Sequence, residues 1–229
     1  MDHIFAFPEV RKVLRSWVGY QGLAEILSDC ADLEVFIAGG AVRNCFLTPP
    51  LEIRDFDFFV NGPSFERALR ILERHGALME TPYGSPRWYP AQNSEYYADF
   101  IPIRDFKPGL WQCEDIIDVL NQFDFTASAL AFDLRTERGF DPQNGFRDLS
   151  RRTMKMVRFD YPDGPFIPGA TLSRNTILWF RILHYTKVLK LRIEPLTLNW
   201  LRRHRDYEQH AGIFSALFFS PHDGYLESL

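Results

Sequence analysis

Asp55 and Asp57 stand one residue apart in RDFDFFV, a stretch whose other residues are mostly aromatic or aliphatic. Aspartate is disfavoured in strands and unfavourable to bury without a partner, so this spacing requires a compensating group. Alternate side chains of a strand share one face, which would place the two carboxylates about 6–7 Å apart on the same side. Mg²⁺ prefers such oxygen ligands, and a cation between the two anions relieves their repulsion. The spacing therefore predicts a divalent-metal site.

A glycine pair, Gly39 and Gly40, precedes these aspartates and directly follows a short apolar segment. Glycines let backbone amides approach a ligand closely, and the N-terminus of a helix stabilises phosphate oxygens. Arg43 falls in the first turn of the short helix that we expect here and can make a bidentate contact with the same phosphates. We therefore predict a polyphosphate site at Gly39, Gly40 and Arg43, with bracing of the fold as the alternative role for Arg43.

Other enzymes also use an Asp-x-Asp pair, and such a pair alone is a weak signal. Phosphohydrolases of the haloacid dehalogenase type place a nucleophilic aspartate after an apolar strand, but here Arg54 directly precedes Asp55. Metal-dependent glycosyltransferases use the pair, but a Gly-Gly-x-Val-Arg unit is not expected of them. The combination of a strand, two glycines, an arginine and a second strand with both aspartates on one face favours metal-assisted polyphosphate chemistry.

Several segments together resemble a known family. GGAVRN and RDFDFFV resemble the GGxVRD…DxD motif of the nucleotidyltransferases related to DNA polymerase beta, most closely the bacterial tRNA CCA-adding enzymes and poly(A) polymerases. FDFTASALAFD (123–133), DPQNGFRDL (141–149) and KVLKLRIEP (187–195) resemble that family's RRDFTINALAYD, its DPFGGLEDL and the end of its neck helix. The similarity implies a nucleotidyltransferase head domain that is followed by a helical neck.

The resemblance also implies nucleotidyl transfer from an NTP with the help of two Mg²⁺ ions. Asp55 and Asp57 would hold the metal, and Asp99 would be the third catalytic carboxylate, unless it is a solvated aspartate at a strand edge. Asp124 and Thr126 would bind the nucleotide near its sugar, although they could instead cap the start of a strand. We therefore expect an enzyme whose metal ligands and catalytic residues are the same three carboxylates.

Some family positions carry other residues in this chain. The replacements in the head are Asn44 for Asp, Val60 for Thr, Gln122 and Phe123 for two arginines, and Ser128 for Asn. On the neck helix, the family's base-reading EDxxR aligns with Arg174, Asn175 and Leu178. Because the carboxylate and the guanidinium of that motif are both lost, we do not predict faithful CCA synthesis.

Charge is unevenly distributed along the chain. The net charge is −4, yet residues 171–205 carry eight Lys or Arg against one Glu, whereas residues 1–170 carry 18 against 25 acidic residues. Arg174 and Arg181 lie in the basic segment, and we predict that they contact the nucleotide, while the segment as a whole could follow an RNA backbone. Attraction to the acidic body of the chain is the alternative role for this segment.

Composition is that of an ordinary globular protein, with 46% hydrophobic and 24% charged residues. The three cysteines show no metal-ligand spacing. The sequence shows neither a signal peptide nor an apolar run of the roughly 20 residues that cross a bilayer. We expect a soluble, cytoplasmic protein without a membrane partner.

Periodicity and turn residues predict an α+β chain, in which a mixed sheet with flanking helices forms a head domain (1–168) and a small all-α neck domain (169–229) follows. Expected strands cover residues 35–38, 53–60, 96–103, 126–134 and 153–157. Expected helices cover 9–29, 42–47, 65–75, 114–120, 172–191, 195–204 and 207–219. Residues 81–94, rich in Pro, Gly, Ser and Tyr, are predicted to form a loop.

The leading hypothesis is a Mg²⁺-dependent nucleotidyltransferase that uses an NTP and adds to RNA, such as a tRNA 3′ end. A second hypothesis keeps the enzyme but takes a protein or a small molecule as acceptor. A third is a non-catalytic nucleotide- or RNA-binding module, against which the presence of both strand aspartates argues. Neither the donor nucleotide nor the oligomeric state is predicted.

Overall fold

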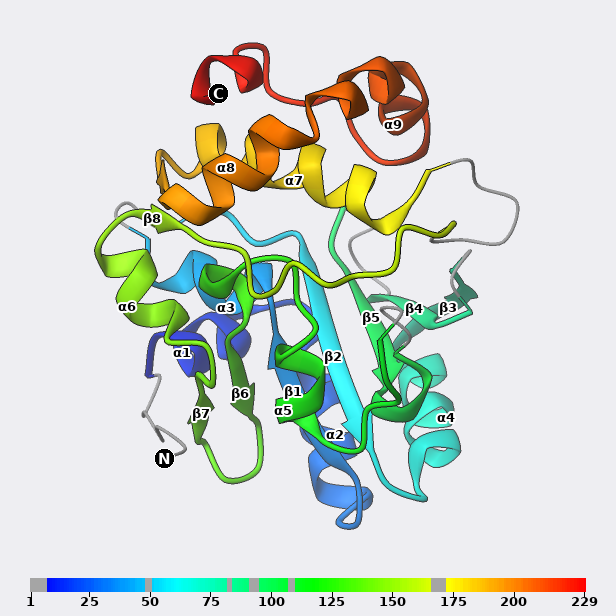
Figure 1. Cartoon of the computed structure of the whole chain (residues 1–229). Helices are drawn as coiled ribbons and strands as arrows, with labels where there is room; N and C mark the ends of the chain where they lie inside the picture. Colours follow the sequence, from blue (N-terminus) through cyan, green and yellow to red (C-terminus); the bar gives the residue numbers. More distant parts are fainter. Residues whose placement is uncertain (1–7, 48–50, 82–83, 91–94, 107–109, 166–171) are drawn as a thin grey trace. The chain divides into compact units, whose positions relative to one another are not determined.

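The computed structural model of the chain describes residues 8–47, 51–81, 84–90, 95–106, 110–165 and 172–229 (Figure 1). The chain forms two compact units. The first comprises Met1–Phe106, Gln112–Leu120 and Leu130–Pro142, and the second comprises Lys107–Trp111, Asn121–Ala129 and Gln143–Leu229. The domain boundary predicted between residues 168 and 169 falls outside the described residues and stays a prediction.

A mixed sheet, with seven strands among the described residues, forms the centre of the first unit. Its strands are, in spatial order, β3 (Gly76–Glu80), β4 (Pro86–Pro90), β5 (Tyr97–Pro102), β2 (Asp55–Asn61), β1 (Glu34–Ala38), β6 (Ala131–Asp133) and β7 (Gly139–Phe140). β2 and β5 run parallel, while the other neighbouring pairs run antiparallel (Figure 1). The predicted mixed sheet is confirmed.

Three helices pack on one face of this sheet, namely α1 (Pro8–Ser16), α2 (Tyr20–Asp29) and α4 (Phe65–His75). Phe56 and Phe58 of β2 are buried in the core that these helices form with the sheet. Trp17 packs against both, with ring centroids 4.6 and 6.1 Å away. Because residues two apart on a strand share a side, Asp55 and Asp57 belong to the opposite face.

Helix α4 follows from its local sequence. Ala68, Ile71 and Leu72 recur at helical spacing and are all buried. Glu66 in the first turn and Arg74 in the last turn complement the helix dipole. The helix covers the residues predicted for it.

Shorter elements complete the first unit: α3 (Gly40–Cys45), the 3₁₀ turn η1 (Ile103–Asp105) and α5 (Ile116–Leu120).

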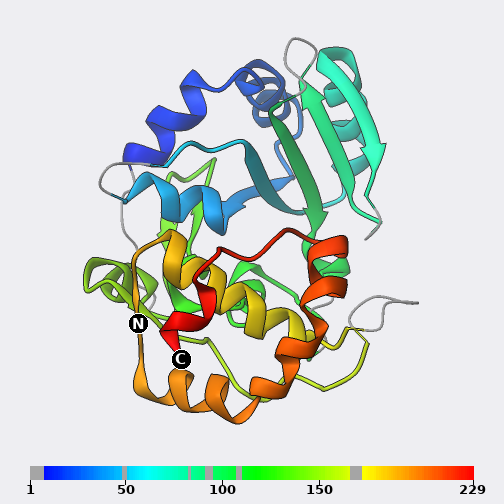
Figure 2. The same cartoon turned by 90° about the horizontal axis from the view of Figure 1, so that it is seen from above.

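The second unit is mainly helical. Its elements are η2 (Thr126–Ser128), α6 (Gly145–Ser150), β8 (Thr153–Met154), α7 (Arg174–Val188), β9 (Arg192–Ile193), α8 (Pro195–Arg203), η3 (Arg205–His210), α9 (Ala211–Leu217) and η4 (Tyr225–Ser228). α7 begins where Ser173 Oγ accepts a hydrogen bond from the Thr176 backbone N–H. The C-terminal turn η4 lies beside α7 (Figure 2). The predicted helical C-terminal region is confirmed, and none of the described helices is long and apolar enough to span a membrane.

Several stretches differ from their predictions. The helix predicted over 9–29 is two helices, α1 and α2, and the helix predicted over 207–219 is η3 followed by α9. The predicted loop 81–94 contains β4, in which Trp88 is fully buried and donates its indole N–H to the Leu72 carbonyl oxygen at 2.9 Å. Prolines at both ends of β4 concealed the strand, although a proline is tolerated at a strand end. The predicted strand 126–134 is instead the turn η2 followed by β6, and these two elements belong to different units.

Candidate metal and nucleotide site

Asp55 and Asp57 lie at the beginning of β2. Asp55 is exposed and Asp57 is half-buried, whereas Phe56 between them is 1% exposed. The Cα atom of Asp57 is in register with that of Ala38, the last residue of β1, and the chain turns at Gly39 directly afterwards. The aspartate-bearing end of β2 therefore lies beside the glycine bend.

Asp99 lies on the neighbouring parallel strand, β5. Its register partner is Asp57, and the register partner of Asp55 is Tyr97. Residues aligned in this way project to the same face of the sheet. Burial, and then the negative charges of Asp55, Asp99 and Asp57, raise the pKa of Tyr97 to about 12. Asp55, Asp57 and Asp99 therefore share one face of β2 and β5 with Tyr97, and we call these three carboxylates the acidic cluster.

Arg87 of β4 holds both oxygens of Asp99. Its Nε donates to Oδ1 at 2.6 Å and its Nη2 donates to Oδ2 at 2.8 Å. The guanidinium carbon lies 4.1 Å from the centre of the Tyr97 ring. The hydrogen bond to Asp99 raises the pKa of Arg87 above its usual range. Sequence analysis missed Arg87 because it lies in the predicted loop, and no local pattern pairs it with a residue 12 positions away.

The donor chemistry of Asp55 and Asp57 fits Mg²⁺, which commonly takes one or two carboxylates from the protein and completes its shell with water and phosphate oxygens. Among the described residues, no three His, Cys, Asp or Glu side chains are grouped so that they could hold one ion. This agrees with the engagement of Asp99 by Arg87. The roles of Asp55 and Asp57 as metal ligands, and of Asp99 as a third ligand, stay predictions.

Gly39 makes the bend beside these aspartates. Its φ of 77° and ψ of −138° lie where residues other than glycine are strained. Arg43 in the following short helix is 5% exposed, and its Nε and Nη2 donate to Asn44 Oδ1 at 3.1 and 2.9 Å. Asn44, which replaces an aspartate of the family motif, therefore still serves as an acceptor for the arginine. A phosphate contact of Gly39, Gly40 or Arg43 stays a prediction.

Asp124, in the second unit, is buried between two arginines of α7. It accepts hydrogen bonds from Arg174 Nη2 at 2.7 Å and from Arg181 Nε. Burial opposes ionisation most strongly, but the charges of Arg181 and Arg174 outweigh it and lower the pKa of Asp124. Three residues predicted to bind the nucleotide therefore form an ion triad with one another.

Thr126 and Gln122, both in the second unit, also have partners within it. Thr126 is 1% exposed and donates to Asp148 Oδ2 at 2.8 Å. Gln122 Oε1 accepts a hydrogen bond from the Trp111 backbone N–H at 3.3 Å, and Gln122 Nε2 donates one to the Trp111 carbonyl oxygen at 3.1 Å. The glutamine that replaces a family arginine thus fixes the backbone of a partly exposed tryptophan.

The predicted site residues therefore fall into two sets. The first unit holds the metal and phosphate set, which consists of Gly39, Gly40, Arg43, Asp55, Asp57 and Asp99. The second unit holds the nucleotide set, which consists of Asp124, Thr126, Arg174 and Arg181. Within each unit the structure brings these residues onto adjoining elements.

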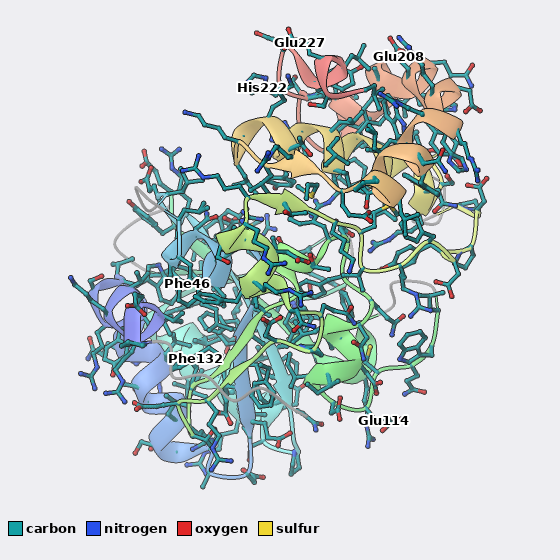
Figure 3. All side chains as sticks on the ribbon, turned by 60° about the vertical axis from the view of Figure 1, so that its left-hand side comes forward. Phe46, Glu114, Phe132, Glu208, His222 and Glu227 are labelled. Carbon is teal, nitrogen blue, oxygen red and sulfur yellow. The ribbon has the colours of Figure 1, made fainter. Side chains whose placement is uncertain are left out.

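Many charges of the basic segment are paired within the second unit. Arg174 and Arg181 share Asp124, Lys187 binds Glu227 at 2.9 Å, and Arg205 lies 3.8 Å from Glu208. Figure 3 labels Glu208 and Glu227 among the side chains of this unit. The exceptions among the described residues are Lys190, Arg192 and Arg203, for which no ion pair is found, and Arg202, whose guanidinium donates to the Leu229 carbonyl oxygen. Internal pairing therefore accounts for much of the charge that suggested an RNA track.

Residues 10–152 match the family described as "Gabija anti-defense 2 family protein". Two curated proteins are also similar. The "Multifunctional CCA protein" of Haemophilus ducreyi is 26% identical over 58% of this chain and 32% of its own length. The "CC-adding tRNA nucleotidyltransferase" of Synechocystis sp. is 25% identical over 72% of this chain and 36% of its own length. The chain thus matches only about a third of each of these relatives.

Solved structures support the same fold. A CCA-adding enzyme in complex with CTP superposes with a TM-score of 0.65 and 17% identity over 90% of this chain and 47% of that one. The Thermotoga maritima CCA-adding enzyme complexed with tRNA gives a TM-score of 0.63 and 20% identity over 88% of this chain and 46% of that one. The resemblance to the head and neck of CCA-adding enzymes is confirmed at the level of the fold.

Proposed function

The chain belongs to the Gabija anti-defense 2 family, and we propose that it is a metal-dependent nucleotidyltransferase that moves a nucleoside monophosphate from an NTP to an acceptor hydroxyl. One observation carries this proposal. Asp55 and Asp57 share a face of β2, and Asp57 is in register with the residue that directly precedes the Gly39 bend. One curated relative of this chain is named a CC-adding tRNA nucleotidyltransferase, which is an enzyme of this type, and another is named a multifunctional CCA protein.

In the proposed reaction, Asp55 and Asp57 hold the divalent ions. When bound, such ions offset the charge of the triphosphate and make the acceptor hydroxyl more acidic. The acceptor oxygen forms a bond to the α-phosphorus, the bond to the pyrophosphate oxygen breaks, and pyrophosphate leaves with the electron pair while the hydroxyl proton passes to solvent. Gly39 and Gly40 leave room for the triphosphate, and Arg43 supports it.

For the acceptor, we propose an RNA hydroxyl such as a tRNA 3′ end. The names of the curated relatives favour this choice, and so do Lys190, Arg192 and Arg203. A protein or small-molecule acceptor is the second candidate. The internal pairing of much of the basic segment favours it, and so does the family's description as anti-defense, because a transferase that counteracts a defence system can act on a component of that system.

The test is incubation of the protein with each α-³²P-labelled NTP and Mg²⁺, together with total RNA or lysate protein. Label in RNA supports the first acceptor, and label in protein supports the second. The double variant Asp55→Asn/Asp57→Asn should lose the transfer. Glu73→Gln, an exposed carboxylate on α4 at the other face of the sheet, should retain it. Transfer that persists in the double variant, or label in neither acceptor, contradicts the proposal.

A further inference from the structure

The ion pair between Arg87 and Asp99 changes the charge that a metal ion meets at the acidic cluster. Asp55, Asp57 and Asp99 bring three negative charges to one face of two neighbouring strands. Such charges repel one another unless a cation compensates them. Arg87 supplies one positive charge through two hydrogen bonds, and this charge offsets that of Asp99 before any metal binds.

The geometry of this pair makes it a strong one. Arg87 and Asp99 are register partners across β4 and β5, so their backbones hold the side chains opposite each other. The Asp99 side chain is 15% exposed and that of Arg87 is 30% exposed. Contact with the Tyr97 ring favours the same position of the guanidinium. Bidentate pairs of this kind bind more tightly than single charged hydrogen bonds.

A divalent ion and the guanidinium cannot both use Asp99 without mutual repulsion. Each Asp99 oxygen already accepts one N–H from Arg87. An ion on either oxygen would lie roughly 4 Å from the guanidinium charge, a distance at which like charges repel appreciably even near a protein surface. Binding of the ion to Asp99 therefore requires Arg87 to move away.

We propose that Arg87 is a positioning residue that competes with the divalent ion for Asp99, so that the resting site withholds Asp99 from the metal. This inference rests on the proposed function, since it concerns the same metal. A site with two carboxylates binds a free divalent ion weakly, and phosphate oxygens of an NTP complete its coordination. Arg87 thereby favours binding of the metal together with the nucleotide, because the metal alone binds the site only weakly.

The test measures the binding of Mn²⁺, without nucleotide, to the full chain. Electron paramagnetic resonance gives the affinity, and water-proton relaxation gives the number of water molecules on the bound ion. Arg87→Gln should bind Mn²⁺ about tenfold more tightly, with fewer waters on the ion, because the oxygens of Asp99 replace them. Adding Asp99→Asn to this variant should remove the gain. Arg54→Gln is the matched control, since this exposed arginine pairs with Glu52 and should change the affinity less than about twofold.

Equal or weaker Mn²⁺ binding by Arg87→Gln overturns the inference, and so does an equal gain in Arg54→Gln. Arg87→Lys keeps the charge but cannot hold both oxygens, so it should show a smaller gain. Circular dichroism checks that Arg87→Gln is folded. If it is not, Arg87→Lys decides the question: a Mn²⁺ affinity and a number of waters on the bound ion equal to those of the wild type overturn the inference. Mn²⁺ binding that survives Asp55→Asn/Asp57→Asn contradicts the proposed function. Absence of binding by both the wild type and Arg87→Gln contradicts both proposals.

Discussion

The Cα atom of Asp57 lies in register with that of Ala38, so one of the paired aspartates is fixed beside the residue that leads into the Gly39 bend. In the proposed reaction, the backbone of that bend, rather than a side chain, determines where the triphosphate lies. Gly39 donates its N–H to the Leu130 carbonyl oxygen at 3.1 Å and has a φ of 77°. A change in this backbone should therefore alter the site without removing a carboxylate.

Gly39→Ala should lower nucleotidyl transfer strongly and destabilise the fold by about 1–3 kcal/mol, because a Cβ strains a backbone in this region. Gly84→Ala is the matched control, since Gly84 also has a positive φ, of 82°, and a Cβ there would meet nothing within 4 Å. Transfer assays and urea unfolding of both variants separate the two effects. If Gly39→Ala and Gly84→Ala lost similar amounts of nucleotidyl transfer and had similar stability, the Gly39 bend would have no special role.

Arg135 should be a stabilising residue of the first unit. Its guanidinium donates to the Leu33 carbonyl oxygen at 2.6 Å, to that of Leu27 at 2.8 Å and to that of Cys30, all at or just after the end of α2. Arg135→Lys should destabilise the protein by about 1.5–3 kcal/mol, because a lysine cannot serve three separate carbonyls and hydrogen bonds to charged groups are strong. Urea unfolding measures the loss, and Arg138→Lys, at an exposed position nearby, should change it little.

Local sequence patterns were enough to predict the elements that carry the aspartates. An aromatic and aliphatic run followed by the turn residues 61–63 predicted β2, and Ser64 and Gly76 as the end signals predicted α4. The partners of the site residues depend instead on contacts between distant segments. Arg87 meets Asp99 only through the register of β4 and β5, and Asp124 meets an arginine 50 positions later in the chain. No periodicity encodes such pairs, so a single sequence could not predict them.

Asp124→Asn should destabilise the second unit by about 3–5 kcal/mol, because it leaves Arg174 and Arg181 partly buried without their shared carboxylate. Hydrogen exchange of the α7 backbone amides should report the loss as faster exchange. Asp160→Asn breaks an exposed pair with Arg158 in the same unit and should cost at most about 1 kcal/mol. Equal protection of α7 in both variants would contradict a stabilising role for the triad.

His184 should make the stability of the second unit depend on pH. Burial, and then the charges of His222 and Arg181, lower the pKa of His184 from 6.5 to about 4. Its Nδ1 accepts the His222 backbone N–H at 3.0 Å, which a protonated ring cannot do. Between these two pKa values the unfolded chain binds a proton that the folded chain does not. The contribution of His184 is therefore complete above pH 6.5 and is lost as the pH falls toward 4.

His184→Gln should flatten the dependence of the free energy of unfolding on pH between 4 and 6.5, as measured by urea unfolding at a series of pH values. Phe218→Leu is a suitable comparison, because the Phe218 ring packs 5.2 Å from the Phe214 ring and does not titrate. That variant should lower stability by a similar amount at every pH and keep the slope of the wild type. An unchanged slope in His184→Gln would mean that the folded chain accepts the proton as readily as the unfolded chain does.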